Sequence, residues 1–306
     1  MPELPDVELY VEALERHVVG QRLVSLDVHT PFLLRTVDPP LQSVGDKQVL
    51  GVRRLGKRIV FSLDDELFIV VHLMVAGRFK WSAGNKRPAR NKNVLATFVF
   101  PSGTLTLTEA GSKKRASLHL ARGVSSLAPF ERGGIEPLEM SLDEFAARLR
   151  SENHTVKRSL TDPRLFSGIG NAYSDEILHR ARLSPVKLTS RLADDEIGRL
   201  YESTQTVLRE WVDRLRAEVG SGFPEKVTAF RDEMAVHGKF GQPCPVCGTA
   251  VQRIRYAENE TNYCPRCQTD GRLLADRALS RLLKADWPRT LEEMEQHVAR
   301  RRGGDP

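Results

Sequence analysis

The chain begins with Met1-Pro2-Glu3, and a proline directly after the initiator methionine offers an amine that can do covalent chemistry. Pro2 is small enough for Met1 to be removed during maturation, which leaves a secondary amine at the head of the chain. Terminal α-amines titrate at about pH 8, so a neutral fraction can attack an aldehyde carbon and form an imine. The carboxylate of Glu3 is placed to carry protons to the group being displaced. The alternative is an ordinary frayed chain end, because Met-Pro starts are common.

A second set of reactive side chains lies near the C-terminus, where all four cysteines fall in two C-x₂-C pairs sixteen residues apart. The pairs are Cys244 with Cys247 and Cys264 with Cys267. This spacing lets four thiolates surround one Zn²⁺ tetrahedrally, and such a site adds folding free energy that a small module cannot draw from its own core. Use of cysteine for metal rather than disulfides points to a reducing compartment. Zinc ribbons occur in many unrelated proteins, so the module alone does not define a function.

A glycine-rich turn, Gly168-Ile169-Gly170-Asn171, precedes a segment with helical periodicity. Two glycines allow consecutive backbone N–H groups to face an anion, and we expect Asn171 to cap a helix that begins at Ala172. A phosphate gains from both features at a helix N-terminus. The alternative is an ordinary turn between packed helices.

The elements that must position these groups follow from the hydrophobic pattern. Residues 5–19 repeat apolar side chains at helical spacing, and the texture is then strand-like to about residue 122. Asp64-Asp65 and Pro101-Ser102-Gly103 are predicted hairpin turns. Many short strands with tight turns favour a sandwich or barrel. Helical periodicity resumes over residues 141–219, so the fold class is a multidomain α+β protein.

Composition limits the classes of function. The chain has 306 residues, of which 40% are hydrophobic, so it is long enough for two domains with substantial cores. The net charge of +6 and a pI of about 9.2 fit an anionic partner. No apolar stretch is long enough to span a membrane, and the N-terminus lacks the apolar core of a secretory signal. We therefore expect a cytoplasmic protein.

Three separated stretches resemble the formamidopyrimidine-DNA glycosylase and endonuclease VIII family. The first is Pro2-Glu3-Leu4-Pro5-Asp6-Val7-Glu8, where Asp6 replaces the family's usual glutamate. Residues 156–185 resemble the family's helix–two-turns–helix element, and residues 238–268 resemble its C-terminal zinc finger. The resemblance covers about residues 2–268. It implies a bifunctional DNA glycosylase and abasic-site lyase, with duplex DNA in a cleft between two halves and the damaged nucleotide extruded from the stack.

The resemblance also implies roles for individual residues. Pro2 is the expected nucleophile at the C1′ of the damaged nucleotide, and Glu3 is the expected proton donor. Lys57, which corresponds to the family's strand lysine, is expected to hold a phosphate near the lesion; without the resemblance it reads as a solvated strand lysine. Lys157 and Asn171, with the backbone of Gly170, are expected to contact phosphates that flank the lesion.

Other positions depart from the family pattern. The family arginine that clamps phosphate five residues before the third cysteine is replaced by Asn259, with Glu258 and Glu260 beside it. That change predicts either another clamp residue or weakened backbone cleavage. The residue expected to fill the void of the flipped base is Val75, with Met74 one place earlier.

The loop expected to reach the orphaned base carries three adjacent cations, and the sequence does not choose among them. They are Lys113, Lys114 and Arg115. The run of basic residues over 86–92 is either a backbone contact or a solvated loop. The stretch 219–240 is shorter than in relatives that cap 8-oxoguanine with a long loop, which argues against 8-oxoguanine as the main substrate.

These inferences define the predicted organisation. Residues 1–125 form a catalytic β-sandwich domain with an N-terminal helix, 126–140 a linker, 141–223 a helical DNA-binding domain, 224–268 the zinc finger, and 269–306 a helical extension. The extension is expected to pack on the zinc module or to bind a partner. One structural zinc per chain is the only expected cofactor. The expected partner is duplex DNA with a damaged base or abasic site, bound by a monomer.

Two alternatives use the same features. A non-enzymatic lesion-binding or architectural protein would explain Asn259 and Val75, although it has no need of the Pro2-Glu3 pair. A zinc-ribbon protein of RNA metabolism would explain the cysteine pairs and the basic charge.

Overall fold

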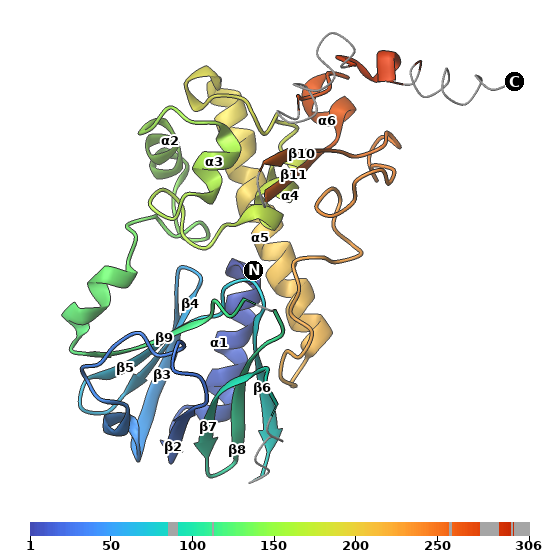
Figure 1. The fold of residues 1–306 in the computed structure, drawn as a ribbon. Coiled ribbons are helices and arrows are strands. Elements are labelled where there is room, and N and C mark those ends of the chain that lie inside the picture. The colour runs from blue at the N-terminus through green and yellow to red at the C-terminus, as the bar shows by residue number, and fades with distance from the viewer. Residues whose placement is uncertain (85–90, 112, 257–258, 276–287, 295, 297–306) are drawn as a thin grey trace, which may run out of the picture. The chain divides into compact units, whose positions relative to one another are not determined.

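The computed structural model describes residues 1–84, 91–111, 113–256, 259–275, 288–294 and 296 (Figure 1). The chain forms two compact units. Unit 1 combines Met1–Ile135 with Leu208–Ala229, and unit 2 combines Glu136–Val207 with Phe230–Pro306. The division falls within the long helix α5 (Asp194–Val219), which contributes residues to both.

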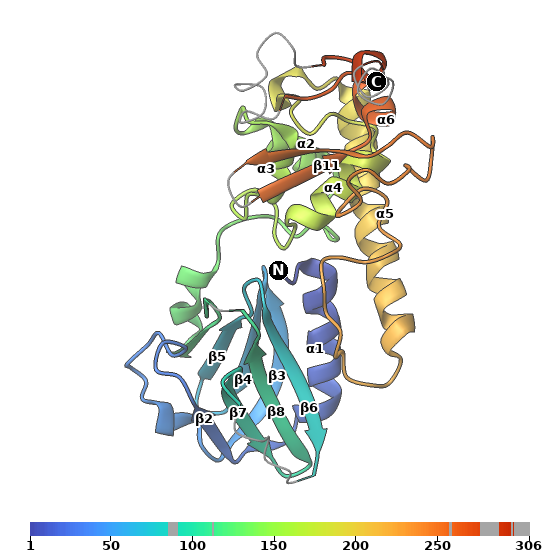
Figure 2. The same cartoon turned by 45° about the vertical axis from the view of Figure 1, so that its right-hand side comes forward.

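Unit 1 is a β-sandwich flanked by the N-terminal helix α1 (Leu4–Val18) (Figure 2). One sheet has the strand order β1-β3-β4-β5-β9 and the other has the order β2-β7-β8-β6. The strands of the first sheet are β1 (Arg22–Leu23), β3 (Lys47–Leu55), β4 (Arg58–Leu63), β5 (Leu67–His72) and β9 (Ser117–Arg122). Those of the second are β2 (Ser25–Val28), β6 (Gly77–Ala83), β7 (Val94–Phe100) and β8 (Gly103–Glu109). The predicted sandwich is confirmed.

Alternation along the strands builds the core of this unit. Ile59 and Phe61 in β4 point into the same buried cluster as Ile69 and Val71 in β5, while the residues between them face the other side of the sheet. The predicted turn between β4 and β5 is confirmed, and both Asp65 and Glu66 take positive φ there.

The helix predicted over residues 5–19 is confirmed as α1, whose apolar stripe enters the core of unit 1. The segment predicted as the linker 126–140 differs in part from that expectation. A 3₁₀ helix, η2 (Val124–Phe130), covers its start, and Leu127 packs against the outer face of the β4–β5–β9 sheet. The short apolar face of η2 makes this part of the segment structured. The glycines from which the linker was predicted give no sign of that face. A second 3₁₀ turn, η1 (Leu41–Val44), precedes β3.

Unit 2 contains the predicted helices and the cysteine module. Its helices are α2 (Leu142–Arg150), α3 (Val156–Thr161), α4 (Asn171–Arg180), η3 (Thr189–Arg191), the N-terminal part of α5, and α6 (Pro265–Thr269). Ser141 and Glu144 form a capping box that fixes the start of α2. The strands β10 (Gln252–Tyr256) and β11 (Asn259–Tyr263) form the two-stranded hairpin of the module.

Part of the C-terminal extension packs on the zinc module. Leu273 donates its N–H to the carbonyl of Arg289, and Leu291 donates to the carbonyl of Gly271, just after α6. Leu274 also donates its N–H to the Tyr263 hydroxyl in β11 (2.8 Å). The helical stripe expected around residues 278–283, Trp287 and the basic end at 300–302 lie outside the described residues.

Candidate functional site

The N-terminus of unit 1 is buried rather than frayed. Pro2 and Glu3 both have little exposed surface, and Glu3 stands directly before the first turn of α1. The Glu3 N–H donates to Oδ2 of Asp6 (3.0 Å), so the carboxylate at position 6 holds the entry to the helix. A shorter Asp in place of the family glutamate suits this local bond, because it sits three residues into the helix.

The charges around the terminal amine favour its neutral form. Burial is the largest influence and lowers the pKa of the Met1 amine below its ordinary value of 8.0. The carboxylate of Glu3 opposes that shift, whereas the cations Arg78 and Lys57 reinforce it. A neutral amine is the form that attacks an electrophilic carbon. This amine belongs to Met1, one residue before the expected nucleophile, so it reports the environment in which Pro2 begins.

Lys57 lies in the turn between β3 and β4, where Gly56 takes a positive φ of 61°. Burial lowers the pKa of the Lys57 ammonium, and the charge that opposes this shift is Glu3. No ion pair is formed by Lys57 among the residues that the structure describes. The structure therefore brings the Met1 amine, Glu3 and Lys57 into one electrostatic group.

The turn between β5 and β6 presents Val75 at its tip. The Val75 side chain is 55% exposed, which is unusual for a large apolar residue and fits a wedge position. Gly77 closes the turn by donating its N–H to the Leu73 carbonyl (2.9 Å), and a Cβ at Gly77 would come within 2.2 Å of that oxygen. The Arg78 guanidinium donates to the Val75 carbonyl (3.1 Å) and stiffens the tip.

Met74 reaches this geometry only by taking a positive φ of 52°. Residues with a Cβ occupy that region at a cost of about 1–2 kcal/mol. The wedge turn thus stores local strain next to the exposed Val75.

The basic loop after β8 is anchored by a buried carboxylate. Glu109 is 1% exposed and accepts the backbone N–H groups of Arg115 and Ala116 at 2.9 to 3.1 Å. The Lys114 ammonium is held by the Glu109 carbonyl and by Oδ1 of Asn93. Lys113 and Arg115 are exposed. The geometry leaves these two as the cations of the loop that face solvent.

In unit 2, the glycine-rich turn leads into α4, with Gly168 at a positive φ of 79°. The expectation that Asn171 caps the helix is wrong, because α4 begins at Asn171 and Gly170 is the cap residue. The Asn171 side chain is used elsewhere: its Nδ2 donates to the Glu260 carbonyl in β11 (2.8 Å). A residue one position inside the helix points away from the helix's own first N–H groups and is available to the neighbouring hairpin.

Lys157 in α3 lies beside the same helix start. Its ammonium donates to the Asn171 carbonyl (3.2 Å) and forms an ion pair with Asp175. The Asp175 carboxylate is fully buried and also accepts from Nδ1 of His237 (2.8 Å) and from the backbone N–H of Asn262 (3.1 Å). Lys157 is therefore positioned by Asp175, and any phosphate it contacts shares it with that carboxylate.

Sequence reasoning missed the role of the acidic pair on α4. Besides Asp175, the Glu176 carboxylate accepts three consecutive backbone N–H groups, those of Ala235, Val236 and His237, at 2.7 to 2.9 Å. Burial raises the pKa of Glu176, and these three hydrogen bonds oppose the shift. The pair joins α4 to the segment that leads into the cysteine module. Two adjacent carboxylates in the middle of the predicted helix were the available signal.

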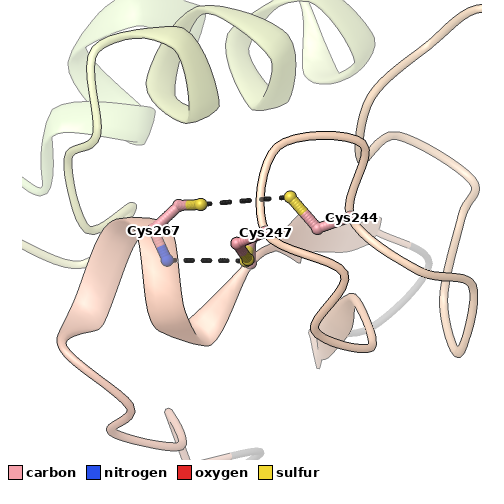
Figure 3. A group of neighbouring side chains, drawn as sticks. Cys244, Cys247 and Cys267 are labelled. Carbon is pink, nitrogen blue, oxygen red and sulfur yellow. Dashed lines mark hydrogen bonds between the residues drawn. The ribbon is translucent and has the colours of Figure 1, made fainter.

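The four cysteines meet as predicted. Figure 3 shows three of them, Cys244, Cys247 and Cys267. Their Sγ atoms all lie within 4.8 Å of one another, with Cys244 to Cys267 at 3.9 Å and Cys247 to Cys264 at 3.4 Å. A tetrahedron with Zn–S bonds of about 2.3 Å has edges of about 3.8 Å, so the four sulfurs fit one Zn²⁺ and are too far apart for disulfides.

A histidine that the sequence did not single out touches this site. Nε2 of His179, on α4, lies 3.3 Å from Sγ of Cys244, and the imidazole is 6% exposed. A ring N–H aimed at a ligand thiolate is the usual second layer of a metal site.

The finger hairpin compensates for the acidic residue beside Asn259. Glu260 forms ion pairs with Arg253 (3.2 Å) and Arg255 (3.5 Å) in the opposite strand. Arg253 also stacks over the Phe240 ring at 4.1 Å. Asn259 pairs with Tyr256 next to the hairpin turn, and Glu258 lies outside the described residues. The expected repulsion of phosphate by Glu260 is thus reduced, because two guanidinium groups of the opposite strand pair with its carboxylate.

The remaining predictions concern surface residues, only some of which the structure describes. Of the basic run over 86–92, Asn91 and Lys92 are described and both are exposed, while 86–90 lie outside the described residues. Among the described residues, no helix is long and apolar enough to cross a membrane.

A buried amine beside a carboxylate and a lysine, a glycine-rich helix start with a lysine, and a four-cysteine finger together define a DNA-repair glycosylase. Family models agree along most of the chain. The formamidopyrimidine-DNA glycosylase N-terminal domain matches residues 1–114, its H2TH domain matches residues 134–220, and the zinc finger found in FPG and IleRS matches residues 241–269.

Curated relatives and solved structures match over the same length. The formamidopyrimidine-DNA glycosylase of Pelotomaculum thermopropionicum is 31% identical over 88% of this chain and 99% of its own, and that of Listeria innocua is 29% identical over 88% and 100%. A Lactococcus lactis formamidopyrimidine-DNA glycosylase bound to DNA with an abasic site superposes with a TM-score of 0.76 at 28% identity, over 87% of this chain and 99% of that chain.

A complex of the Lactococcus lactis enzyme with DNA that contains Fapy-dG gives a TM-score of 0.75 at 27% identity, over 88% of this chain and 100% of that chain. The chain belongs to the formamidopyrimidine-DNA glycosylase family. Its matched domains are those of a DNA glycosylase with a C-terminal zinc finger. The non-enzymatic binder and the RNA zinc-ribbon protein are not favoured.

Proposed function

We propose that the mature chain removes oxidised or ring-opened bases from DNA and cleaves the resulting abasic site through an imine on Pro2. The observation that carries this proposal is the electrostatic group at the N-terminus. Burial and two cations hold the pKa of the terminal amine below 8.0, and Glu3 lies within its field.

The steps follow from these positions. After loss of Met1, the neutral Pro2 nitrogen attacks C1′ of the extruded nucleotide, and the base leaves with a proton supplied by Glu3. The Pro2 nitrogen passes its proton to the Glu3 carboxylate, which returns it to the ring oxygen as the C1′–O bond breaks. The sugar opens to an iminium, whose positive nitrogen acidifies the adjacent carbon. Loss of that proton expels the 3′ phosphate in β-elimination. Lys57 balances the negative charge of a phosphate near the lesion.

Binding and zinc have separate roles in the proposal. The turn at Gly170, together with Lys157 and Asn171, is assigned to phosphates that flank the lesion, because the positive end of a helix dipole attracts anions. Val75 fills the void of the flipped base, and the orphaned base is assigned to one of the two exposed cations, Lys113 or Arg115. Zinc, when bound, is structural and holds the hairpin.

The proposed substrate preference draws on the solved relatives and on the length of the stretch 219–240. Relatives are co-crystallised with DNA that contains Fapy-dG, an abasic site or carbocyclic 8-oxo-G, and we propose ring-opened purines as the main substrates of this chain. The short stretch 219–240 favours them over 8-oxoguanine. We also propose that a monomer acts with the bacterial nucleoid in the cytoplasm.

A panel of duplexes tests the function, each with one defined lesion, scored separately for base release and strand scission. We expect base release from ring-opened purines, followed by scission. The variant Asn259→Arg reports on the second elimination: it should increase δ-elimination products if Asn259 limits that step. Release of no lesion by the zinc-loaded, Met1-processed protein would refute the proposed function.

A further inference from the structure

A row of polar side chains crosses the outer face of the β4–β5–β9 sheet and has no place in the mechanism above. Arg58 in β4 lies opposite His72 in β5, and His72 lies opposite Ser117 in β9. The neighbours Ile59, Val71 and Leu118 point into the core, so the row faces away from it. Adjacent strands are about 4.8 Å apart, so the row spans about 10 Å.

An aromatic side chain organises one end of this row. His119, on the same face of β9, packs edge-on against Phe130 with ring centroids 4.9 Å apart. The Arg58 guanidinium lies 5.9 Å from the same ring centroid, and its Nη1 donates to the Phe130 carbonyl at 3.4 Å. Phe130 thus holds both side chains in place. The Arg58 guanidinium retains further N–H donors beyond this single bond.

The charges around the row are all of one sign. Burial lowers the pKa of Arg58, and the charge that adds to the shift is the cation Arg132. Burial lowers the pKa of His72 to about 4, with Arg58 the largest of the added charges. His119 is likewise acted on by Arg58 and by Arg35. Within the described residues, no carboxylate forms an ion pair with Arg58, His72 or His119.

The two imidazoles are neutral at neutral pH, and the charged groups that act on the row include the arginines Arg58, Arg35 and Arg132. Cations without a paired carboxylate raise the energy of the free protein and lower that of any complex that brings an anion. Arg58 directly follows Lys57 in the chain, so their Cα atoms are about 3.8 Å apart. The row therefore begins beside Lys57, which is already assigned to a phosphate. A DNA strand whose phosphate is bound by Lys57 supplies further phosphates at regular intervals along the row. A free phosphate ion would occupy only one point of the row of about 10 Å, so we take the DNA backbone as the ligand.

We propose that Arg58, Ser117 and His119 form a second backbone-phosphate site, next to the phosphate assigned to Lys57. The site extends the DNA-glycosylase function and takes a phosphodiester of the bound duplex. The donors are the Arg58 guanidinium, the Ser117 hydroxyl and a ring N–H of His119. The proposed site contacts no base. It therefore strengthens DNA binding and fixes the position of the protein along the duplex, without selecting damaged over undamaged DNA.

The test is the salt dependence of binding, measured by fluorescence anisotropy on two duplexes, one with a non-cleavable abasic analogue and one undamaged. Arg58→Met keeps the packing on Phe130 and removes the charge. It should lower the slope of log K against log salt by about 1 and weaken both duplexes by the same factor. Arg58→Lys should restore most of the slope. His119→Gln is the second variant, and its loss should be smaller.

The matched control is Arg122→Met, which removes an exposed cation from the far end of β9, where Arg122 donates to the Asp65 carbonyl (3.5 Å). It should leave the slope unchanged. A scan that replaces one DNA phosphate at a time by an uncharged methylphosphonate, along the undamaged flank, locates the phosphate that the site binds. One such replacement should weaken DNA binding by the wild type and leave DNA binding by Arg58→Met unaffected. Circular dichroism and thermal unfolding confirm that each variant is folded.

A folded Arg58→Met protein with the wild-type slope overturns the proposal, as does an equal loss in Arg122→Met. So does a loss seen only with single-stranded RNA as the competing ligand. The readout is binding alone. Failure of the proposed catalysis would instead appear as an absence of base release and trapping in the wild type, with the salt slopes intact.

Discussion

His179 offers a quantitative test of how the helical part of unit 2 supports the zinc finger. Its Nε2 lies 3.3 Å from Sγ of Cys244, and both groups are buried. A hydrogen bond to a charged acceptor contributes about 1.5–3 kcal/mol. A thiolate that holds zinc is such an acceptor. Since about 1.4 kcal/mol is a factor of ten, loss of the N–H should lower zinc affinity by roughly 10- to 150-fold.

His179→Phe is the variant of choice, because it keeps a ring in the same space and removes only the donor. The assay is competition with a colorimetric chelator, which gives the zinc affinity and the release rate without any DNA. His179→Gln, whose amide can reach the position of Nε2, should retain most of the affinity. His154→Phe is the control, because His154 pairs with Glu152 (2.8 Å) away from the cysteines.

A zinc affinity of His179→Phe within twofold of the wild type would refute the reasoning. So would an equal loss in His179→Gln, because that result would assign the effect to packing rather than to the hydrogen bond.

Three further predictions concern unit 1. Val75→Gly should reduce binding to a lesion duplex and leave binding to an undamaged one unchanged, because the wedge acts only where a base is extruded; unequal anisotropy titrations confirm this, and parallel losses contradict it. Gly77→Ala should destabilise the fold by about 2 kcal/mol or more, because its Cβ would meet the Leu73 carbonyl at 2.2 Å; a denaturant midpoint equal to the wild type's would disprove the clash. The pH profile of borohydride trapping should have its inflection below pH 8, because the burial that lowers the pKa of the Met1 amine should act in the same direction on the Pro2 amine that processing frees, and trapping needs the neutral form. Stability linked to this amine is present above pH 8 and is lost as pH falls, and Lys57→Ala should move the inflection upward because it removes a nearby cation.

Local patterns predicted most of the fold. Apolar spacing identified α1, and alternation with turn residues identified the β4–β5 and β7–β8 hairpins, because each of these signals lies within a few residues. The pairing of distant strands, such as β5 with β9, has no local signal and came only with the fold. The 3₁₀ helix η2 was also missed, since its short apolar face becomes visible only against the sheet it covers.

The candidate site divides in the same way. The cysteine spacing and the Pro2-Glu3 start were readable because ligand geometry and chain-end chemistry fix residue type and position. The residues that support the cysteine module were not readable from the sequence. Asp175, Glu176 and His179 bond to residues about 60 or more positions away, and no local pattern marks them. Asn171 was placed at the right helix end but given the wrong bond, because its partner is a carbonyl of β11.

The most direct test of the central claim is the identity of the residue that bonds to the sugar. Borohydride-trapped complexes on an abasic-site duplex can be digested and mapped by mass spectrometry. The account predicts a chain that begins at Pro2, with the deoxyribose fragment on the Pro2 nitrogen and far less adduct at that position in Pro2→Gly. An adduct on Lys57, whose pKa is also lowered, or fully active protein that retains Met1, would contradict it.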